Sequence, residues 1–289
     1  MLRIHYVSFP GLGIGEFKID SVAFTIFGHP VAWYGVIITF GILMAALYVL
    51  YRAKQEGVKS DDILDLGIYV ILFAVLGCRI FYVLTSLDEF DSFWDVFKIW
   101  NGGLAIYGGI IAGAITIFVF CRLKKRNFYL FLDMIAPAVM LGQMIGRWGN
   151  FMNGEAHGSE TDIFCRMGLR AGEYGEMVFY HPTFLYESLW NLTGFILINI
   201  FYKKKRYNGQ IALMYLTWYG FGRMLIEQLR TDSLYLFGSL AEVWYLKISS
   251  LIGLACFLLF GGILVYCAVK KVKQPTAFRP QNTTTGENE

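Results

Sequence analysis

Long apolar runs recur along the whole chain, separated by short polar segments. Three of them contain no charged residue, and four others are of similar length but include ionisable side chains. A helix needs about 20 largely apolar residues to cross a bilayer, and each run meets that length. The pattern predicts seven membrane-spanning helices, at residues 31–51, 63–87, 99–121, 127–148, 178–202, 207–229 and 248–269. We therefore expect an all-α polytopic membrane protein.

The polar segments between these runs alternate in charge. Those that follow the first, third, fifth and seventh runs are basic, most clearly at 122–126 and 203–206, and the others are acidic, mixed or glycine-rich. Short cytoplasmic loops carry an excess of Lys and Arg, so the alternation predicts an N-terminus outside and a C-terminus in the cytoplasm. We expect residues 1–272 to form the membrane domain, with a small extracytoplasmic head at about 149–180. The polar tail 273–289 is expected to be disordered.

The composition agrees with a bilayer environment. Charged residues make up 16% of the 289 residues, whereas AVILMFWYC residues make up 56%. A soluble domain has roughly 25% charged residues and could not bury this much apolar surface in one core. The net charge of +3 gives no reason to expect a nucleic-acid partner, and the five cysteines lack the spacing of a metal site or disulfide framework. Residues 1–28 do not resemble a cleavable signal peptide.

Several ionisable side chains lie inside the predicted helices, where they are costly and by default indicate a functional site. The alternative is a structural ion pair, or a charge that reaches the interface from a helix end. Asp65 and Asp133 lie near the cytoplasmic starts of their helices, so we expect structural roles for them. Arg79 lies near the outer end of the second helix and leaves both interpretations open.

The run GRWGNFMNGEAHG at 146–158 ends the fourth predicted helix on its outer side. It carries Arg147, Asn150, Asn153 and Glu155 among four glycines. Glycine lets backbone amides approach a ligand closely, and arginine offers a forked donor suited to phosphate. Glycine and asparagine also form structural caps, so this run alone does not decide between a site and a turn.

The sixth predicted helix supplies a second polar set. Tyr219, Arg223 and Glu227 follow at i, i+4 and i+8, which places them on one face over about 12 Å. Arg230 extends this face, about 20° away from Tyr219 around the helix. An Arg223–Glu227 pair that only neutralises itself is part of the expectation, but it does not account for the whole set.

The predicted topology brings these polar groups to one half of the membrane. Arg147 and the polar face of the sixth helix lie at outer ends, and Tyr34, Tyr107 and Glu187 lie near the outer starts of three other helices. Two arginines in an outer leaflet suit the phosphate of a lipid headgroup, and favour a lipid-modifying transferase. A transporter and a non-catalytic lipid-binding scaffold are the competing classes. No HExxH or GxSxG motif supports a metalloprotease or serine hydrolase.

Together these motifs resemble those of the prolipoprotein diacylglyceryl transferases. Besides the run at 146–158, the similarity includes HPVAWYG at 29–35, NGGLAIYGG at 101–109, HPTFLYES at 181–188 and YGFGRMLIEQLR at 219–230. The resemblance implies transfer of the diacylglyceryl group of phosphatidylglycerol to the thiol of a lipobox cysteine, with release of glycerol 1-phosphate. The implied partners are phosphatidylglycerol and prolipoprotein signal peptides in the bacterial cytoplasmic membrane, and no cofactor or metal is implied.

The resemblance also implies functional positions, which are Tyr34, Arg147, Asn150, Asn153, Glu155, Gly158, Tyr219, Arg223, Glu227 and Arg230. On their chemistry, Arg147 and Arg223 would hold the phosphate and neutralise charge on the leaving group. Glu155 and Glu227 would orient these arginines, and the asparagines would bond glyceryl oxygens or shape the turn. The attacking thiol belongs to the substrate, so Cys165 is expected to be a bystander.

One position departs from the family pattern. Some members carry His-Gly-Gly where this chain has Tyr107, Gly108 and Gly109, and that histidine has been a candidate base. A phenol has a pKa near 10 and a thiol near 8.5, so Tyr107 cannot readily accept the thiol proton at pH 7. Tyr107 would then donate a hydrogen bond, and the base would be a carboxylate such as Glu155 or the leaving phosphate itself. His157 and His181 are further, less favoured candidates.

Overall fold

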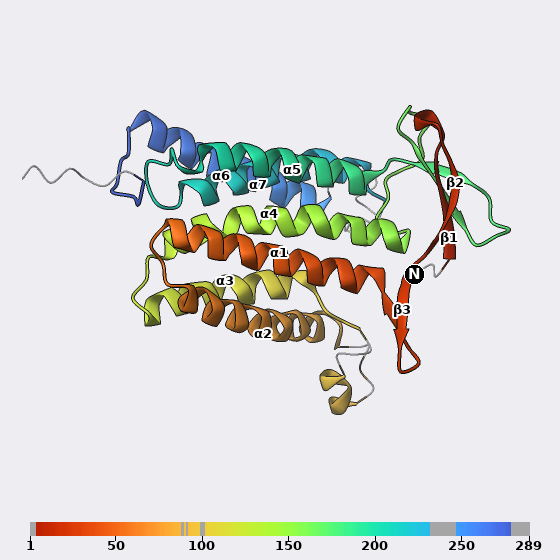
Figure 1. Ribbon diagram of the computed structural model, residues 1–289, viewed down its shortest axis with the longest axis horizontal. Helices are drawn as coiled ribbons and strands as arrows, with labels where there is room; N and C mark the ends of the chain where they lie inside the picture. Colours follow the sequence, from red (N-terminus) through yellow and green to blue (C-terminus); the bar gives the residue numbers. More distant parts are fainter. Residues whose placement is uncertain (1–3, 88–89, 91, 99–101, 232–246, 279–289) are drawn as a thin grey trace, which may run out of the picture. The chain divides into compact units, whose positions relative to one another are not determined.

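The computed structural model describes residues 4–87, 90, 92–98, 102–231 and 247–278 (Figure 1). The chain divides into two compact units. The first combines Met1–Tyr48 with Ile135–Glu289, and the second is Val49–Met134. The boundaries fall within helices α1 and α4, so each of these helices contributes to both units.

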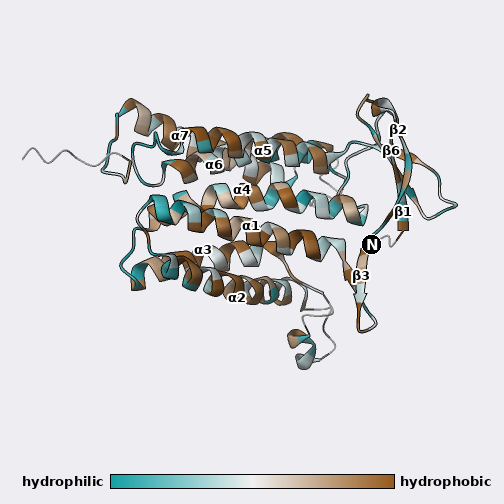
Figure 2. Ribbon diagram, in the orientation of Figure 1, coloured by the Kyte–Doolittle hydropathy of each residue, from teal (hydrophilic) through white to brown (hydrophobic). Residues whose placement is uncertain are grey.

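Seven long helices make up most of the described chain: α1 (Trp33–Gln55), α2 (Ser60–Thr85), α3 (Ile106–Leu123), α4 (Phe128–Asn153), α5 (Thr183–Tyr202), α6 (Gln210–Ile226) and α7 (Ile248–Val269). All but α6 are long and apolar enough to cross a membrane. Hydrophobic residues run along the helices and hydrophilic residues gather in the connections (Figure 2). The expected multi-pass helical architecture is confirmed.

Two helix starts differ from the expectation. The third helix begins at Ile106 rather than at 99, because Gly102 and Gly103 adopt positive φ angles of 91° and 75° that end helical geometry; residues 99–101 lie outside the described part. The fifth begins at Thr183 rather than at 178, directly after Pro182, and the residues before it form a strand.

The expectation of an all-α chain was incomplete, since the described residues include six strands. These are β1 (Ile4–Phe9), β2 (Ile14–Asp20), β3 (Val22–Ile26), β4 (His29–Ala32), β5 (Met167–Ala171) and β6 (Val178–Tyr180). An antiparallel sheet has the order β2-β1-β5-β6, and β3 pairs with β4 as a hairpin. The head therefore combines the N-terminal residues with those after α4. On β1, His5, Val7 and Phe9 are buried at alternate positions, as on a strand with one inward face, and Ser8 is buried as well.

Within the first unit, α5, α6 and α7 pack side by side, and β6 leads directly into α5 (Figure 1). A residue of the predicted disordered tail also belongs to this packing, since Phe278 lies 6.0 Å from the ring of Tyr202. The backbone N–H of Gln274 donates to the carbonyl of Arg206 at 2.9 Å. Residues 279–289 lie outside the described part.

Within the second unit, α2 and α3 approach at glycines. A Cβ on Gly108 would lie 2.1 Å from the carbonyl oxygen of Gly77, so no side chain fits there. Asp65 pairs with Lys124 at 3.3 Å, and Asp133 is fully buried, which agrees with structural roles. Arg79 is also structural.

The buried Arg79 guanidinium donates to the backbone carbonyls of Asp95, Val96, Gly102 and Gly103 at 2.7–2.9 Å. These bonds hold the described stretches at 95–96 and 102–103 against α2.

Candidate active site

Glu187 on α5 is the common partner of three arginines. Arg147 on α4 forms a salt bridge with it, Arg223 on α6 approaches its Oε2 at 3.3 Å, and Arg230 approaches its Oε1 at 3.2 Å. Arg223 also pairs with Glu227 at 2.7 Å. Glu187 and Glu227 are buried, while the arginine side chains keep 11–23% of their surface exposed. Within this set, three guanidinium groups face two carboxylates. We call these five residues the arginine cluster.

The sequence placed Glu187 among the polar groups at the outer helix ends but gave it no specific chemical role. Its signal was present, because it is the one residue among Asp, Glu, Lys and Arg within the predicted span 178–202. What the sequence did not supply was the packing that brings α4 and α6 to it. Tyr219, one turn before Arg223, lines the same narrow cleft as Glu187 and Arg223, as the helical spacing predicted.

Arg230 reaches the arginine cluster by a different route from the predicted one. The α-helix ends at Ile226, Glu227–Leu229 form a 3₁₀ turn, and Arg230 is extended with φ −78° and ψ 143°. The buried Lys247 accounts for this geometry. Its ammonium donates to the carbonyls of Glu227, Gln228 and Arg230 at 2.8, 3.2 and 2.6 Å, and so fixes the turn.

Gly158 lies where three segments meet. Its N–H donates to the carbonyl of His181 at 2.9 Å, it bridges to Arg230, and the next N–H, of Ser159, donates to the carbonyl of Leu229 at 2.7 Å. A Cβ on Gly158 would lie 2.6 Å from the Cβ of His181 and 2.9 Å from the carbonyl oxygen of Leu229. Any larger residue would therefore push apart the segments that carry Arg230 and the start of α5.

The polar residues of the 146–158 run form a chain of hydrogen bonds. Helix α4 continues to Asn153, so Asn150 and Asn153 lie in its last turns rather than in a loop. Arg147 donates to Asn150 at 3.5 Å, and both asparagines donate to Oε1 of Glu155, at 3.3 Å from Asn150 and 2.8 Å from Asn153. Among the described residues, Glu155 thus orients asparagines and reaches Arg147 only through Asn150, which corrects the role expected for it.

The sheet β2-β1-β5-β6 packs against this run through His5 of β1. The His5 ring is fully buried and lies 3.2 Å from where a Cβ on Gly154 would be, and Gly154 has a positive φ of 65°. A side chain at Gly154 would therefore be strained and would contact the ring. Burial lowers the pKa of His5 below its usual value, so the ring is neutral at pH 7.

The remaining candidates have mainly packing contacts. The Tyr34 ring lies against α4, 2.9 Å from a Cβ placed on Gly149. Tyr107 lies in the first turn of α3, in the second unit, with its ring 6.4 Å from that of Phe81. Within the described residues, no group of three His, Cys, Asp or Glu side chains is placed to hold a metal ion.

The two nearby histidines are both engaged. The His157 ring lies 4.0 Å from the ring of Tyr180, and its Nδ1 is 3.1 Å from the carbonyl of Gly158. His181 Nδ1 lies 3.4 Å from the hydroxyl of Tyr186, which in turn lies 3.4 Å from the Cys165 thiol. Burial lowers the pKa of the His181 imidazole.

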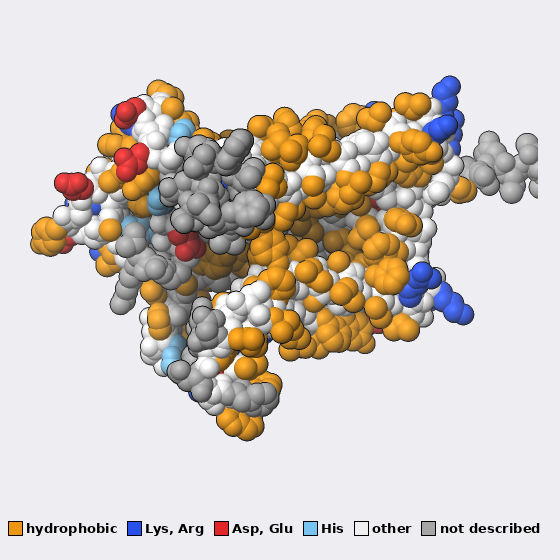
Figure 3. All heavy atoms as spheres, turned by 180° about the vertical axis from the view of Figure 1, so that it is seen from behind, with side chains coloured by type: hydrophobic (Ala, Val, Ile, Leu, Met, Phe, Trp, Pro, Cys, Tyr) orange, Lys and Arg blue, Asp and Glu red, His pale blue; other side chains and the backbone are white. Residues whose placement is uncertain are grey.

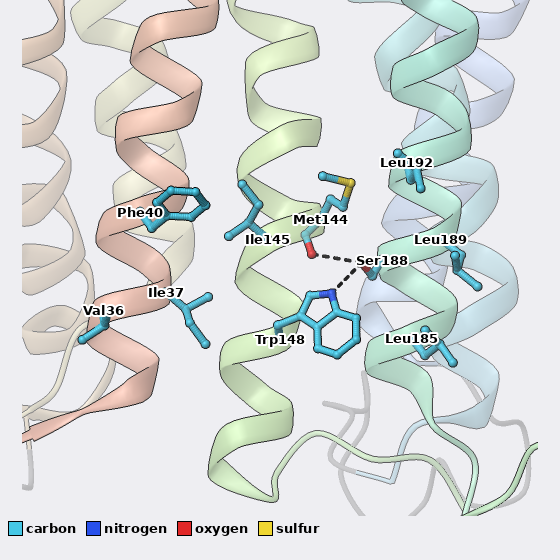
Figure 4. A pocket seen from close by; sticks show the side chains of 10 residues that line it. All are labelled: Val36, Ile37, Phe40, Met144, Ile145, Trp148, Leu185, Ser188, Leu189 and Leu192. Carbon is cyan, nitrogen blue, oxygen red and sulfur yellow. Dashed lines mark hydrogen bonds between the residues drawn. The ribbon is translucent and has the colours of Figure 1, made fainter. Parts of the chain in front are cut away.

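An apolar groove of about 490 Å³ runs beside the helices of the arginine cluster (Figure 4). Its walls come from α1, α4 and α5, with Phe40, Ile145 and Leu189 as examples. Its polar atoms are paired: Trp148 Nε1 donates to Ser188 Oγ at 3.2 Å, and Ser188 Oγ donates to the carbonyl of Met144 at 3.1 Å. The groove can therefore take a hydrocarbon chain but offers little to a polar ligand.

Comparisons with known proteins show the family to which this chain belongs. A family model described as prolipoprotein diacylglyceryl transferase matches residues 21–266. The chain is 44% identical over 223 residues to phosphatidylglycerol–prolipoprotein diacylglyceryl transferase 1 of Clostridium perfringens, covering 75% of this chain and 85% of that protein. It is 40% identical over 266 residues to the corresponding transferase of Listeria innocua, covering 90% and 94%. It is 42% identical over 262 residues to that of Streptococcus pneumoniae, covering 89% and 97%. The chain belongs to the prolipoprotein diacylglyceryl transferase family.

Proposed function

We propose that this protein transfers the diacylglyceryl group of phosphatidylglycerol to the thiol of the lipobox cysteine in a prolipoprotein. Its relatives in Clostridium perfringens, Listeria innocua and Streptococcus pneumoniae are named phosphatidylglycerol–prolipoprotein diacylglyceryl transferases. The observation that carries the proposal is the arginine cluster, in which three arginines converge on the buried carboxylate of Glu187. A partly buried, pre-arranged cationic site stabilises charge that develops on a leaving phosphate.

The reaction makes one bond and breaks one. The substrate sulfur attacks the glyceryl carbon that carries the phosphodiester, a C–S thioether forms, and the C–O bond to phosphate breaks with its electron pair. Glycerol 1-phosphate leaves, and the thiol proton passes to a base or to that phosphate. Arg147 and Arg223 hold the phosphate, and Arg230 adds positive charge beside them. Glu187 and Glu227 keep the guanidinium groups in place through the salt bridges described above.

The other residues of the site bind and shape it. Asn150 and Asn153 bond glyceryl oxygens from positions set by Glu155, and Gly158 keeps Arg230 close to the start of α5. Tyr34 and Tyr219 contribute substrate contacts beside them. The proton has three open routes: Glu155 as base, the leaving phosphate, or a path assisted by a hydrogen bond from Tyr107.

The membrane arrangement forms part of the proposal. We assign α6 as a further span, so that seven helices cross the bacterial cytoplasmic membrane. The N-terminus lies outside, the C-terminus lies in the cytoplasm, and the arginine cluster faces the extracytoplasmic side. The alternation of basic and acidic connections supports this orientation. In the apolar groove, the walls of α1, α4 and α5 suit one acyl chain of the lipid donor.

A direct assay tests the function. The purified full chain is incubated with phosphatidylglycerol and a peptide containing a lipobox cysteine, and the products are analysed by mass spectrometry. We expect a diacylglyceryl adduct on the peptide cysteine and release of glycerol 1-phosphate, whereas a Cys→Ser peptide should give neither. A transporter or a lipid-binding scaffold would leave both substrates intact, and that result would overturn the proposal.

A further inference from the structure

A second cavity lies in the first unit, at the ends of α5 and α6 opposite to those that carry the arginine cluster. It has a volume of about 370 Å³ and is formed where α5 ends, α6 begins and α7 ends. The last turn of α5 and the end of α7 supply apolar walls, including Phe201, Leu264 and Ala268. Lys204, Arg206 and Gln210 supply the polar part of the lining. We call this cavity the basic pocket.

The basic pocket contains cations without neutralising partners. Lys204 and Arg206 are exposed, and neither forms an ion pair with a carboxylate among the described residues. No Asp or Glu occurs anywhere in the segments 188–226 and 248–278 that surround it. In Figure 3, the lysine and arginine side chains in view gather at helix ends, while hydrophobic side chains cover the helix lengths. The pocket thus combines an apolar interior with an unneutralised positive rim.

The backbone holds one of these cations in place. The N–H of Arg206 donates to Oε1 of Gln210 at 2.6 Å, and its carbonyl accepts from the N–H of Gln274 at 2.9 Å. Because both backbone groups of Arg206 are bonded, its backbone is held at the rim, and the guanidinium extends from there. The Lys204 ammonium lies 5.9 Å from the centre of the Phe201 ring, so its stem covers part of the apolar wall.

We propose that the basic pocket binds the phosphate headgroup of an anionic phospholipid, with an acyl chain of that lipid against the apolar walls. Arginine and lysine at the rim pair with the phosphate, and a bilayer supplies the hydrocarbon that the interior requires. Basic pockets between membrane helices are known to select anionic headgroups in this way. The lipid held here is not the transferred substrate, because the arginine cluster lies at the other ends of these helices. The inference does not depend on the proposed transferase function.

Lipid counting by native mass spectrometry tests the proposal. The full chain in detergent is titrated with phosphatidylglycerol, and the bound lipids are counted for the wild type and for a Lys204→Gln/Arg206→Gln variant. Each cation near a headgroup contributes about fivefold to affinity, so the variant should bind one lipid roughly thirtyfold more weakly. The matched control is Lys203→Gln/Lys270→Gln, which removes the same charge at the same helix ends without altering the pocket lining. It should keep the wild-type occupancy.

Two further measurements identify the ligand and the place. Inorganic phosphate should not displace the lipid, because displacement would mean that the pocket binds free anions. Phosphatidylcholine should not replace it, because replacement would mean that the pocket binds only the acyl chain. The pocket variant should also retain transfer activity towards a lipobox peptide. Unchanged lipid occupancy in the pocket variant would overturn the proposal. If the pocket variant lost both the bound lipid and the transfer activity, the lipid would belong to the transfer site, and the proposal would be overturned as well.

Discussion

Glu187 balances three arginines that reach it from three segments of the chain. A buried carboxylate is tolerated only when its charge is compensated, and removing one member of such a group leaves the others unpaired at a cost of about 3–5 kcal/mol. The same arrangement restricts where each guanidinium can point. In the proposed mechanism, Glu187 therefore sets the geometry of the arginines that hold the phosphate, although its own charge is wrong for binding phosphate.

We expect Glu187→Gln to lower the rate of diacylglyceryl transfer by about a hundredfold or more. The amide keeps the shape of the side chain but can no longer balance Arg147, Arg223 and Arg230, so these groups repel one another and lose their alignment. Thioether formation on a lipobox peptide measures the effect, and gel filtration confirms that the variant is folded. Near-normal turnover would show that Glu187 only completes the packing of α5.

Tyr107 allows a second expectation at the residue scale. If it donates one hydrogen bond, Tyr107→Phe should retain measurable activity, with a loss of about 0.5–1.5 kcal/mol, or roughly two- to tenfold. The pH–rate profile should lack an ascending limb governed by an imidazole near 6.5. Such a limb would indicate an imidazole base, because burial lowers the pKa of His181 and that base would gain activity as pH rises through it. A folded but inactive Tyr107→Phe enzyme would instead place the phenol in proton transfer.

Among the elements of the fold, the long helices were the most predictable. Their apolar runs are far longer than any strand, so the bilayer requirement identified them from composition alone. The strands were missed because they are segments of only three to seven residues, and the sheet is completed by the pairing of β1 with β5, more than a hundred residues away. Arg230 was assigned to a helical face because helical periodicity does not show where a helix ends. The residue that fixes this end is Lys247, which lies just before α7, 17 residues further along the chain.

The turn after α6 gives a prediction at the scale of the element. Lys247→Met should lower transfer efficiency by about tenfold or more, because three carbonyls lose their donor and Arg230 is no longer held beside Glu187. Lys247→Arg, which keeps several donors, should recover most of the activity.

A double-mutant cycle distinguishes positioning from general stability. If Lys247 acts through Arg230, then adding Lys247→Met to Arg230→Ala should cost little further activity. Full additivity of the two losses, with an equal drop in thermal stability in both backgrounds, would contradict the positioning role.

At the scale of the whole molecule, the site depends on which membrane face each helix end meets. The charge of the connections predicts this assignment, because those after α1, α3, α5 and α7 are basic. The arginine cluster and the head lie at the ends of α5 and α6 that are opposite to the basic connection between them. In this orientation, the phosphatidylglycerol that reaches the arginine cluster would come from the outer leaflet.

Reporter fusions test this orientation directly. A reporter that is active only in the cytoplasm should work when fused after Lys273 and fail when inserted at Gly172, in the turn between β5 and β6 with a positive φ of 67°. A reporter that requires export should give the opposite pattern at both positions. Because Lys and Arg excess sets orientation, replacing the basic residues 203–206 should weaken the topology more than the same number of changes in the head. Cytoplasmic activity at Gly172 would place the arginine cluster on the inner side, and would remove the outer-leaflet lipid as its substrate.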